Sequence, residues 1–498
     1  MSGSDAESLQ GAGGAPAREA DPDARWRELV FPAGWRNPQP APRYNLVVIG
    51  AGPAGLVTSI AAAGLGARVA LVERHAMGGD CLNVGCVPSK TLLAAAAGGL
   101  GFDAAMQRLR EVRAGIAVHD SVERYTRAGV DVFLGAARFE DAHTVVVDGQ
   151  RLRTRRTVIA TGARAAMPPV PGLAELPALT NETVFALRAQ PRRLAVLGGG
   201  PIGCELAQAF ARLGSAVDLV EMQPRLLSAD DAEPASLVQE ALVRDGVRLH
   251  LGRKVVAAAR ESGGSVLALD DGMRIEADAV LVAAGRRRNV EGLDLDRAGV
   301  RLDARGGLQV DARLRTTHPD VFAAGDVCSP LQFTQVADAQ ARIVVRNALF
   351  MGRARTDALV VPWCTYTDPE LAQVGATRRE LEAAGRPFDA FRFAFADLDR
   401  GRTDGDAAGW AEVRVARGSD RLLGATVVGR DAGEQLAPLV VLMTLRQGLG
   451  ALGSLVLPYP TRSEYLRRLV DAWNRTRLTP RTAGLLSWWL RRSRGGSR

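Results

Sequence analysis

Two stretches of the chain show the same succession of apolar runs and glycine-rich turns. The first, YNLVVIGAGPAGLVTSIAAAGLGARVALVER, predicts a buried strand at residues 45 to 49, a turn, an alanine-rich helix and a second strand ending at Glu73. The second, RLAVLGGGPIGCELAQAFARLGSAVDLVEM, repeats this order and ends its second strand at Glu221. Because strand, helix and strand in this order form a βαβ unit, the pattern predicts an α/β protein with two such units.

The turns of both units carry glycines with the spacing GxGxxG, at Gly50, Gly52 and Gly55 and at Gly198, Gly200 and Gly203. The first glycine makes the tight turn, the second lets the backbone approach a pyrophosphate, and the third admits close helix packing. The acid that ends each second strand is placed to accept a hydrogen bond from a ribose hydroxyl. The sequence therefore predicts two dinucleotide sites, commonly for FAD and a nicotinamide cofactor.

At the second site, the acidic Glu221 would repel the 2′-phosphate of NADPH. NADH is therefore the favoured cofactor over NADPH. Arg225 lies only four residues further on and works against this preference.

Composition places the chain among multidomain globular proteins. It has 498 residues, of which 47% are hydrophobic and 24% charged, and it has no apolar run of the roughly 20 residues that a membrane span needs. The net charge of +8 comes from arginines spread along the chain, which argues against nucleic-acid binding. Five cysteines do not form a secreted disulfide framework, so we expect a cytoplasmic location. Residues 1–43 lack the apolar core of a secretory signal and are expected to form a mobile N-terminal extension.

The segment GGDCLNVGCVPSK places Cys81 and Cys86 five positions apart, directly after the first βαβ unit. A metal site is disfavoured, because no second Cys or His pair stands nearby in the sequence, and no bound metal is predicted. A static disulfide is disfavoured in a cytoplasmic chain. A redox pair that takes two electrons from a flavin is the favoured interpretation, with Lys90 helping to hold the anionic thiolate and reduced flavin.

With these residues the chain resembles the class I pyridine nucleotide-disulfide oxidoreductases, the family of dihydrolipoyl dehydrogenase, glutathione reductase and mercuric reductase. The resemblance extends to ATG at 160–162, TTHPDVFAAGDV at 316–327 and YTDPELAQVG at 366–375, and it spans about residues 45 to 480 in family order.

The resemblance implies a role for each residue of the site. Cys86 would be the charge-transfer thiol against the flavin, and Cys81 the interchange thiol that attacks the substrate. Lys90 would pair with Glu205, although an exposed helix acid is the alternative for Glu205. Asp326 would bind the ribityl chain of FAD. Further predicted cofactor contacts are Gly79, Lys90, Thr161, Gly162 and Gly285. The other cysteines, Cys204, Cys328 and Cys364, are expected to be structural.

The resemblance also implies the domain organisation. An FAD-binding domain at 44–165 and 290–356 would be interrupted by an NAD(P)-binding domain at 166–289. An α+β dimerisation domain at 357–480 would follow, then a Trp/Arg-rich tail at 481–498. In this family the last segment of the dimerisation domain supplies the acid/base group of the partner's active site, so we expect a homodimer with shared sites.

That last segment departs from the disulfide reductases, which carry HPTxSE where this chain has YPTRSE, with Tyr459 and Glu464. A phenol of pKa near ~10 is a poor base at neutral pH, whereas imidazole near ~6.5 can both take and give a proton. Thiolates can bind a soft metal ion without such a base. Mercuric reductases are similar in showing a tyrosine followed five residues later by glutamate. Two of their features are missing here, a vicinal cysteine pair at the extreme C-terminus and a cysteine-bearing N-terminal metal-binding module.

The expected function is therefore transfer of electrons from NAD(P)H through FAD and Cys81/Cys86 to a small-molecule or metal-ion acceptor such as Hg(II). One alternative is a dihydrolipoyl-dehydrogenase-like disulfide reductase. Another is a flavoprotein whose redox state controls binding to a membrane or partner through the tail LLSWWLRRSRGGSR. A tail without such a function is the favoured interpretation of that ending.

Overall fold

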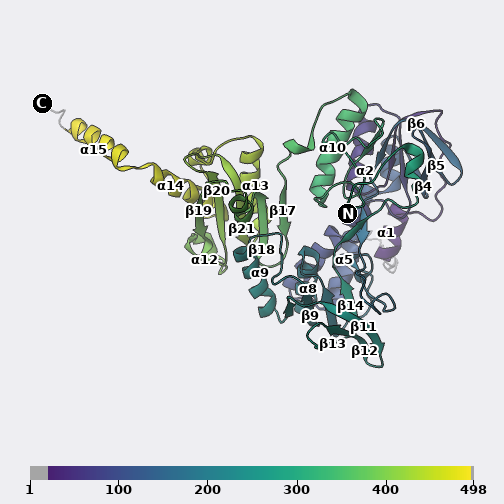
Figure 1. Cartoon of the computed structure of the whole chain (residues 1–498), viewed down its shortest axis with the longest axis horizontal. Helices are drawn as coiled ribbons and strands as arrows, with labels where there is room; N and C mark the ends of the chain where they lie inside the picture. Colours follow the sequence, from purple (N-terminus) through teal and green to yellow (C-terminus); the bar gives the residue numbers. More distant parts are fainter. Residues whose placement is uncertain (1–20, 495–498) are drawn as a thin grey trace, which may run out of the picture.

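The computed structural model describes residues 21–494, which form three lobes and a helix that extends away from one of them (Figure 1). The first lobe contains a seven-stranded sheet in the order β3-β2-β1-β6-β5-β4, with β16 paired to β6. Strands β3, β2, β1, β6 and β16 are parallel, and their buried apolar runs are typical of strands covered on both faces. The strands are β1 Tyr44–Ile49, β2 Val69–Glu73, β3 Val130–Leu134, β4 Ala137–Asp141, β5 Thr144–Val147, β6 Gln150–Ile159 and β16 Val321–Ala323.

Helices cover this sheet and carry the cysteine segment. α2 packs against α10, and α4 packs against α5 and, across the lobe boundary, against α8 of the second lobe. The helices of the first lobe are α1 Pro22–Val30, α2 Pro53–Gly64, α3 Gly79–Asn83, α4 Cys86–Ala97, α5 Phe102–Ala117, α6 Val122–Arg127 and α10 Thr334–Phe350, with 3-10 turns η1 Val118–Asp120, η2 Leu295–Ala298 and η3 Thr356–Ala358.

The described part of the N-terminal segment differs from the predicted mobile extension. α1 begins with Pro22 at its first turn, where the fixed φ of proline is compatible with a helix, and Asp21 accepts a hydrogen bond from the Asp23 backbone N–H at 3.2 Å. Val30 and Asp23 are buried, and the Asp23 carboxylate pairs with Arg113 of α5 at 2.7 Å. The amino-acid composition of the segment did not indicate these packing contacts. Residues 1–20 of the predicted extension lie outside the described residues.

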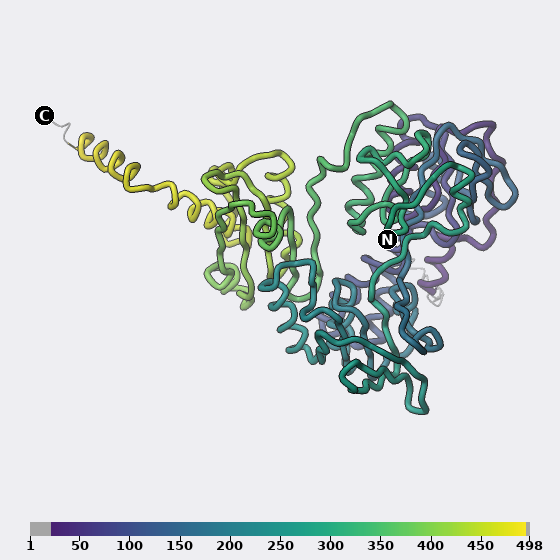
Figure 2. Tube along the Cα trace, viewed as in Figure 1, coloured from purple at the N-terminus to yellow at the C-terminus, as the bar shows by residue number. Residues whose placement is uncertain are grey.

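The second lobe contains a four-stranded parallel sheet in the order β10-β9-β8-β14 and a three-stranded antiparallel sheet in the order β11-β12-β13. Its elements are α7 Asn181–Val184, β8 Arg193–Leu197, α8 Pro201–Arg212, β9 Ala216–Glu221, α9 Ala232–Arg244, β10 Arg248–Leu251, β11 Val255–Glu261, β12 Gly264–Leu269, β13 Arg274–Ala277 and β14 Ala279–Val282. β7 Ala163–Ala165 and β15 Arg286–Arg288 pair antiparallel where the chain leaves and re-enters the first lobe. The first lobe is therefore discontinuous in sequence, as the path in Figure 2 shows.

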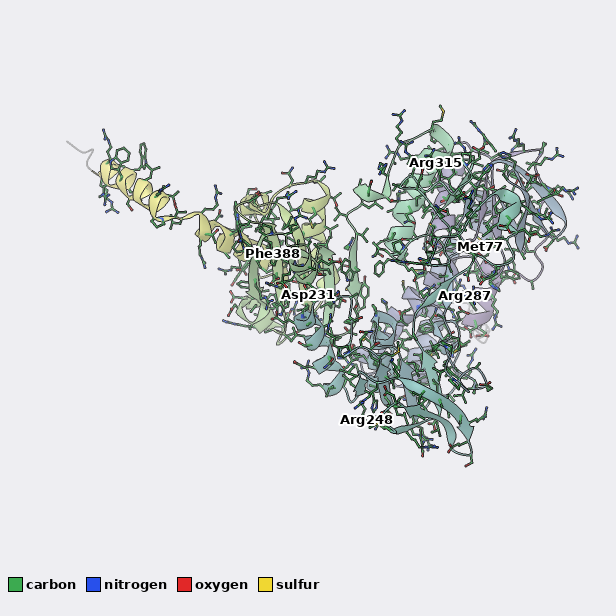
Figure 3. All side chains as sticks on the ribbon, viewed as in Figure 1. Met77, Asp231, Arg248, Arg287, Arg315 and Phe388 are labelled. Atoms are coloured by element: carbon green, nitrogen blue, oxygen red, sulfur yellow. The ribbon has the colours of Figure 1, made fainter. Side chains whose placement is uncertain are left out.

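The third lobe is an antiparallel five-stranded sheet in the order β17-β18-β21-β20-β19, covered by helices. Its elements are β17 Pro362–Thr365, β18 Glu370–Gly375, α11 Arg378–Ala383, β19 Phe388–Ala394, η4 Phe395–Asp397, α12 Asp399–Thr403, β20 Trp410–Ala416, β21 Leu422–Gly429, α13 Ala432–Thr444, η5 Leu449–Ser454, η6 Arg462–Glu464 and α14 Tyr465–Arg477. Asp231, at the start of α9, accepts the backbone N–H groups of Arg378 and Arg379 at 2.9 and 3.0 Å and so joins the second lobe to the third. Figure 3 labels Asp231 near Phe388 of this lobe.

The tail predicted to be rich in Trp and Arg is helical where it is described. α15 Pro480–Arg494 extends from the third lobe, and its Trp488 and Trp489 are exposed. None of the described helices is long and apolar enough to cross a membrane.

The predicted fold class is confirmed: two Rossmann-like α/β lobes, the first interrupted by the second, precede an α+β lobe. The domain boundaries given above stay a prediction.

Candidate active site

The cysteine segment forms two short helical pieces separated by a break. Cys81 lies in α3, and Cys86 is the first residue of α4, so the Cys86 sulfur lies at a helix N-terminus, where a negative charge is favoured. Gly85 occupies the break, because an added Cβ there would come within 2.8 Å of the Asp80 carbonyl oxygen. Both cysteines are free thiols, and the described residues contain no cluster of three or more His, Cys, Asp or Glu that could hold a metal ion.

The two thiols differ in acidity. A hydrogen bond from Cys81, the Thr334 hydroxyl and the Lys90 cation together lower the pKa of Cys86 to about 6. The hydrogen bond to Cys86 and burial raise the pKa of Cys81. Thr334 Oγ1 lies 3.5 Å from Cys86 Sγ. These contacts therefore favour the negative charge of the pair on Cys86 and its proton on Cys81.

Lys90 pairs with Glu205, as predicted, with Lys90 Nζ 2.6 Å from Glu205 Oε2. Glu205 is a residue of α8 and is only 4% exposed, so the alternative of an exposed helix acid is wrong. Its other oxygen accepts the backbone N–H of Tyr366 at 3.0 Å, and the Tyr366 ring centroid lies 4.5 Å from Lys90 Nζ. Side chains from all three lobes therefore meet beside the cysteines.

Tyr366 belongs to this site although the sequence interpretation gave it no role. Burial raises the pKa of Tyr366 to about 12, so its hydroxyl stays protonated at neutral pH. The signal that could have identified it is its place as the first residue of the motif YTDPELAQVG.

The glycine turn of the first βαβ unit is packed so closely that a side chain larger than that of glycine does not fit at its tightest contacts. An added Cβ at Gly55 would overlap the Gly50 carbonyl oxygen, and one at Gly79 would lie 2.5 Å from the Gly52 Cα. The turn and the start of the cysteine segment therefore lie against each other. Glu73 ends β2, and its carboxylate accepts the backbone N–H groups of Ala51 and His75, each at 2.7 Å. These contacts fix the acid at the edge of the turn.

Asp326 is the third residue after the end of β16 at Ala323, close to the strand end as predicted, and burial raises the pKa of its carboxyl group. Arg286, which the sequence interpretation missed, pairs with Asp326 at 3.5 Å and also with Asp80 of α3. Its Nε is buried and lacks a hydrogen-bond partner among the described residues. Its position next to the predicted Gly285 was the available signal.

The residues of the first lobe fit FAD. The glycine turn admits a close approach of the pyrophosphate, Glu73 offers an acceptor, and Arg286 Nε and Asp326 offer polar atoms. The predicted ATG follows the end of β6 directly, where the Thr161 hydroxyl donates to the Asn289 carbonyl at 2.6 Å. Gly162 and Gly285 both have positive φ and open space where a Cβ would be.

The glycine turn of the second βαβ unit is packed in the same way. An added Cβ at Gly203 would overlap the Gly198 carbonyl oxygen, and Gly200 precedes α8. Glu221 ends β9 and accepts the backbone N–H groups of Gly199 and Gln223 at 2.6 and 2.7 Å. The Arg225 side chain, four residues after Glu221, is bound within the protein. Its guanidinium donates to four backbone carbonyls, those of Leu226, Leu227, Ser228 and Asp230, at 2.7 to 3.3 Å.

The structure of one chain places Tyr459 and Glu464 in the third lobe. The Tyr459 hydroxyl donates to Asp399 at 2.6 Å while the residue is 71% exposed, and Glu464 pairs with Arg468 at 2.6 Å. The hydrogen bond to Asp399 raises the pKa of Tyr459. Their place in the partner's site stays a prediction.

The remaining cysteines differ in burial. Cys204 and Cys328 are buried, and burial raises the pKa of both thiols. Cys364 is only partly buried, with its sulfur 3.9 Å from Glu370 Oε2.

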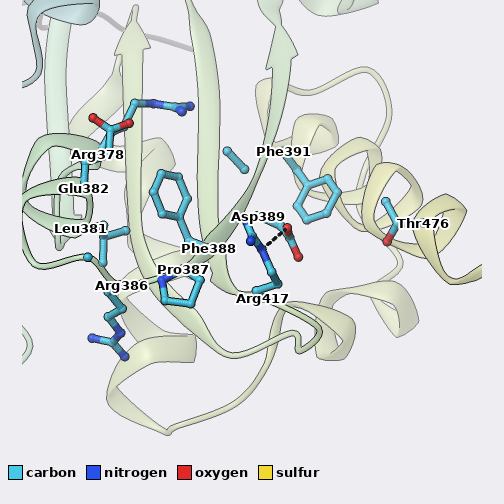
Figure 4. Close-up of a pocket in the computed structure, with 12 residues that line it drawn as sticks. Arg378, Leu381, Glu382, Arg386, Pro387, Phe388, Asp389, Phe391, Arg417 and Thr476 are labelled. Carbon is cyan, nitrogen blue, oxygen red and sulfur yellow. Dashed lines mark ion pairs between the residues drawn. The ribbon is translucent and has the colours of Figure 1, made fainter.

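A surface hollow of about 650 Å³ lies in the third lobe, between α11 and the edge strand β19 (Figure 4). Phe388, Phe391 and Arg417 are among its lining residues, and Arg417 pairs with Asp389 at 3.6 Å. None of the predicted site residues lines it.

The acidity of the thiols can be checked in the FAD-loaded protein. We expect Cys86→Ser to abolish the long-wavelength absorption that a thiolate gives beside oxidised flavin, and Cys81→Ser to show it without prior reduction. In Cys81→Ser the band should disappear as the pH falls and Cys86 becomes protonated, at a midpoint set by how far the serine hydroxyl replaces the hydrogen bond from Cys81. Adding Lys90→Met should move this midpoint to higher pH, because the cation favours the thiolate. The same spectra from both serine variants would show that the assignment of the two sulfurs is wrong.

Comparison with known proteins agrees with this geometry. Residues 44–341 match the family described as pyridine nucleotide-disulphide oxidoreductase, and residues 361–470 match its dimerisation domain. The dihydrolipoyl dehydrogenase of Thermus scotoductus is 36% identical over 86% of this chain and 97% of its own length. A mercuric reductase of Staphylococcus aureus is 33% identical over 85% of this chain and 81% of its own length.

A solved structure has a similar fold over nearly the same length. The Cu(II) complex of the HOCl-induced flavoprotein disulfide reductase RclA from Escherichia coli is 29% identical, with a TM-score of 0.81 over 87% of this chain and 100% of its own. The chain therefore belongs to the pyridine nucleotide-disulphide oxidoreductase family, whose members are oxidoreductases that use FAD, NAD(P)H and a redox-active cysteine pair.

Proposed function

We propose that this oxidoreductase uses Cys81 and Cys86 to reduce a soft metal ion, with Hg(II) as the leading acceptor. The observation that carries the proposal is Tyr459, which stands where the disulfide reductases have their base histidine. Its hydrogen bond to Asp399 raises its pKa, so the phenol stays protonated and cannot serve as a base at neutral pH. An acceptor that needs no base suits this site.

The cysteine pair has the chemistry that a soft metal ion requires. Thiolates are the preferred ligands of soft ions, and the contacts of Cys86 lower the pKa of its thiol. Metal binding would displace the proton that Cys81 holds, because a metal-bound thiol is deprotonated. When bound, FAD accepts the hydride of NAD(P)H and makes two electrons available to this site. Overall, NAD(P)H loses a hydride, Hg(II) gains two electrons to become Hg(0), and one proton is released.

One of the similar proteins is a mercuric reductase by name, which supports a metal acceptor. The RclA structure is by name a Cu(II) complex of a disulfide reductase, which supports metal binding in a protein of this fold. A second candidate function is reduction of a disulfide substrate, as in a dihydrolipoyl-dehydrogenase-like disulfide reductase. The 36% identity to the Thermus scotoductus protein favours this candidate. The two candidates differ in whether the acceptor site must supply and recover a proton.

A homodimer would complete the proposed site. Residues 361–470 match the family's dimerisation domain, and this lobe exposes apolar side chains shortly before Tyr459. Val456 is 93% exposed in the single chain, and Leu445 is 63% exposed. Burying them against a second copy would remove apolar surface from water. Location in the cytoplasm stays a prediction from the sequence, and contact of the tail with a membrane stays the disfavoured alternative.

The acceptor can be identified by steady-state assays. With NADH as donor, we expect Hg(II) to be reduced in the presence of excess thiol at a rate well above that with lipoamide, glutathione disulfide or quinones. Cu(II) is the matched second metal, because it tests whether the site selects Hg(II) among thiophilic ions. Loss of metal turnover in Cys81→Ser would tie the activity to the pair. Faster turnover of lipoamide than of either metal would contradict the proposal.

The nicotinamide preference follows from the second fingerprint. Because Arg225 is bound to backbone carbonyls, the Glu221 carboxylate dominates the ribose position, and we expect a higher kcat/KM with NADH than with NADPH. Glu221→Gln keeps a hydrogen-bond acceptor for Gly199 but removes the charge. It should raise kcat/KM for NADPH relative to NADH by about tenfold, which corresponds to roughly 1.4 kcal/mol. An equal or reversed preference in the unmodified protein would mean that an arginine governs the pocket.

The role of Tyr459 can be tested by restoring the missing base. We expect Tyr459→His to raise lipoamide turnover, because imidazole cycles between acid and base at neutral pH and general acid/base catalysis contributes about 10²- to 10⁴-fold. Rapid mixing with NADH should show flavin reduction nearly unchanged. Tyr459→Phe, which removes the hydroxyl without adding a base, is the control and should give no gain. If the histidine variant reduces its flavin normally and gains nothing with lipoamide, the shape of the acceptor pocket excludes disulfides.

A further inference from the structure

The N-terminal helix α1 lies outside residues 44–341, which match the family, yet it packs against the cysteine segment. Trp26 of α1 donates its indole N–H to Asn83 Oδ1 at 2.8 Å. Asn83 is the last residue of α3, two positions after Cys81 and three before Cys86. It is only 6% exposed, so its amide must satisfy its hydrogen bonds within the protein.

Asn83 holds the start of the cysteine segment. Its amide nitrogen donates to the carbonyls of Met77 and Gly79 at 3.0 and 2.8 Å. An amide side chain has one acceptor end and one donor end, so the Trp26 bond to the oxygen fixes the direction in which the nitrogen points. The Val30 carbonyl at the end of α1 accepts the Met77 backbone N–H at 3.0 Å. α1 is therefore bound both to Met77, before α3, and to Asn83, at the end of α3.

Arg113 of α5 holds the other end of α3. Its guanidinium donates to the Asn83 carbonyl at 3.2 Å and to Asp23 at 2.7 Å, and it stacks 4.0 Å over the Trp26 ring. Asp23 also pairs with Arg110 and Arg188. We name the residues joined by these contacts the α1 clamp: Asp23, Trp26, Asn83, Arg110, Arg113 and Arg188.

The α1 clamp acts on the geometry between the two sulfurs. Gly79 at the start of α3 packs on Gly52 of the fingerprint turn, and Cys81 lies between Gly79 and Asn83. A shift of Asn83 would therefore move Cys81 relative to both Cys86 and the cofactor turn, and thiol chemistry is sensitive to displacements of about 1 Å. We propose that Trp26 is a positioning residue of the cysteine pair, acting through Asn83. This role concerns the pair whatever acceptor it reduces.

The test compares two tryptophans of the same segment in the FAD-loaded protein. Trp26→Phe removes the donor to Asn83 and keeps an aromatic ring under Arg113. The matched control is Trp35→Phe, because Trp35 donates to the Val132 carbonyl of β3 at 3.3 Å and, among the described residues, makes no hydrogen bond to the cysteine segment. Two properties are measured: the equilibrium constant of the cysteine pair with reduced and oxidised dithiothreitol, and the pH midpoint of the thiolate absorption band in the Cys81→Ser background.

We expect Trp26→Phe to change the equilibrium constant with dithiothreitol by about two- to tenfold, the effect of one lost hydrogen bond, and to move the pH midpoint. Trp35→Phe should change neither, although both variants are expected to lower the thermal midpoint. Arg113→Lys, which keeps a charge for Asp23 but loses the fork that reaches Asn83, should act like Trp26→Phe and serves if that variant does not fold. A loss of thermal stability in Trp26→Phe with an unchanged equilibrium constant and pH midpoint, or equal changes in Trp35→Phe, would overturn the positioning role.

Discussion

The ion pair between Lys90 and Glu205 is the interaction on which the arrangement of the site depends. Glu205 is buried in α8, and a buried carboxylate is costly unless it is paired and hydrogen-bonded. Lys90 of α4 supplies the charge, and the Tyr366 backbone N–H supplies the second bond. Satisfying this one carboxylate therefore requires α4, α8 and the start of the third lobe to meet at a single point. Because α4 begins with Cys86, that point lies one turn from the redox pair.

The difference in pKa between the cysteines comes first from the hydrogen bond that Cys81 donates to Cys86, and Thr334 and Lys90 add to it. Two thiols in identical surroundings would have the same pKa. The Cys86 sulfur, however, lies near a helix N-terminus, the Thr334 hydroxyl and Lys90. The hydrogen bond to Cys86 and burial raise the pKa of Cys81. One sulfur is therefore ready to interact with the cofactor as an anion, and the other keeps its proton until an acceptor arrives.

Local patterns in the sequence were sufficient for the two nucleotide turns, because each depends on residues within about thirty positions of one another. Gly55 packs on Gly50, and Glu73 accepts the N–H of Ala51, within one βαβ unit. Contacts across the chain were found only where the family resemblance supplied them, as for Lys90 and Glu205. Arg286 and Asp80 are 206 positions apart, and Tyr366 and Glu205 are 161 apart. No periodicity or spacing connects such residues, so both Arg286 and Tyr366 were missed.

The helix within the described residues 21–43 of the predicted extension was missed for a different reason. Its Ala, Gly, Pro and Asp content is typical of chains that cannot bury enough apolar surface to fold alone. α1 is stabilised instead by a buried charge and one aromatic ring: Asp23 neutralises arginines of the first two lobes, and Trp26 fills the space between Arg113 and Asn83. Arg110 and Arg113 are each less than a tenth exposed, so without Asp23 they would be buried cations with a diminished set of partners. α1, which the composition did not predict, therefore supplies the negative charge that balances buried arginines of the described core. It also places Trp26 against the segment that holds the cysteines.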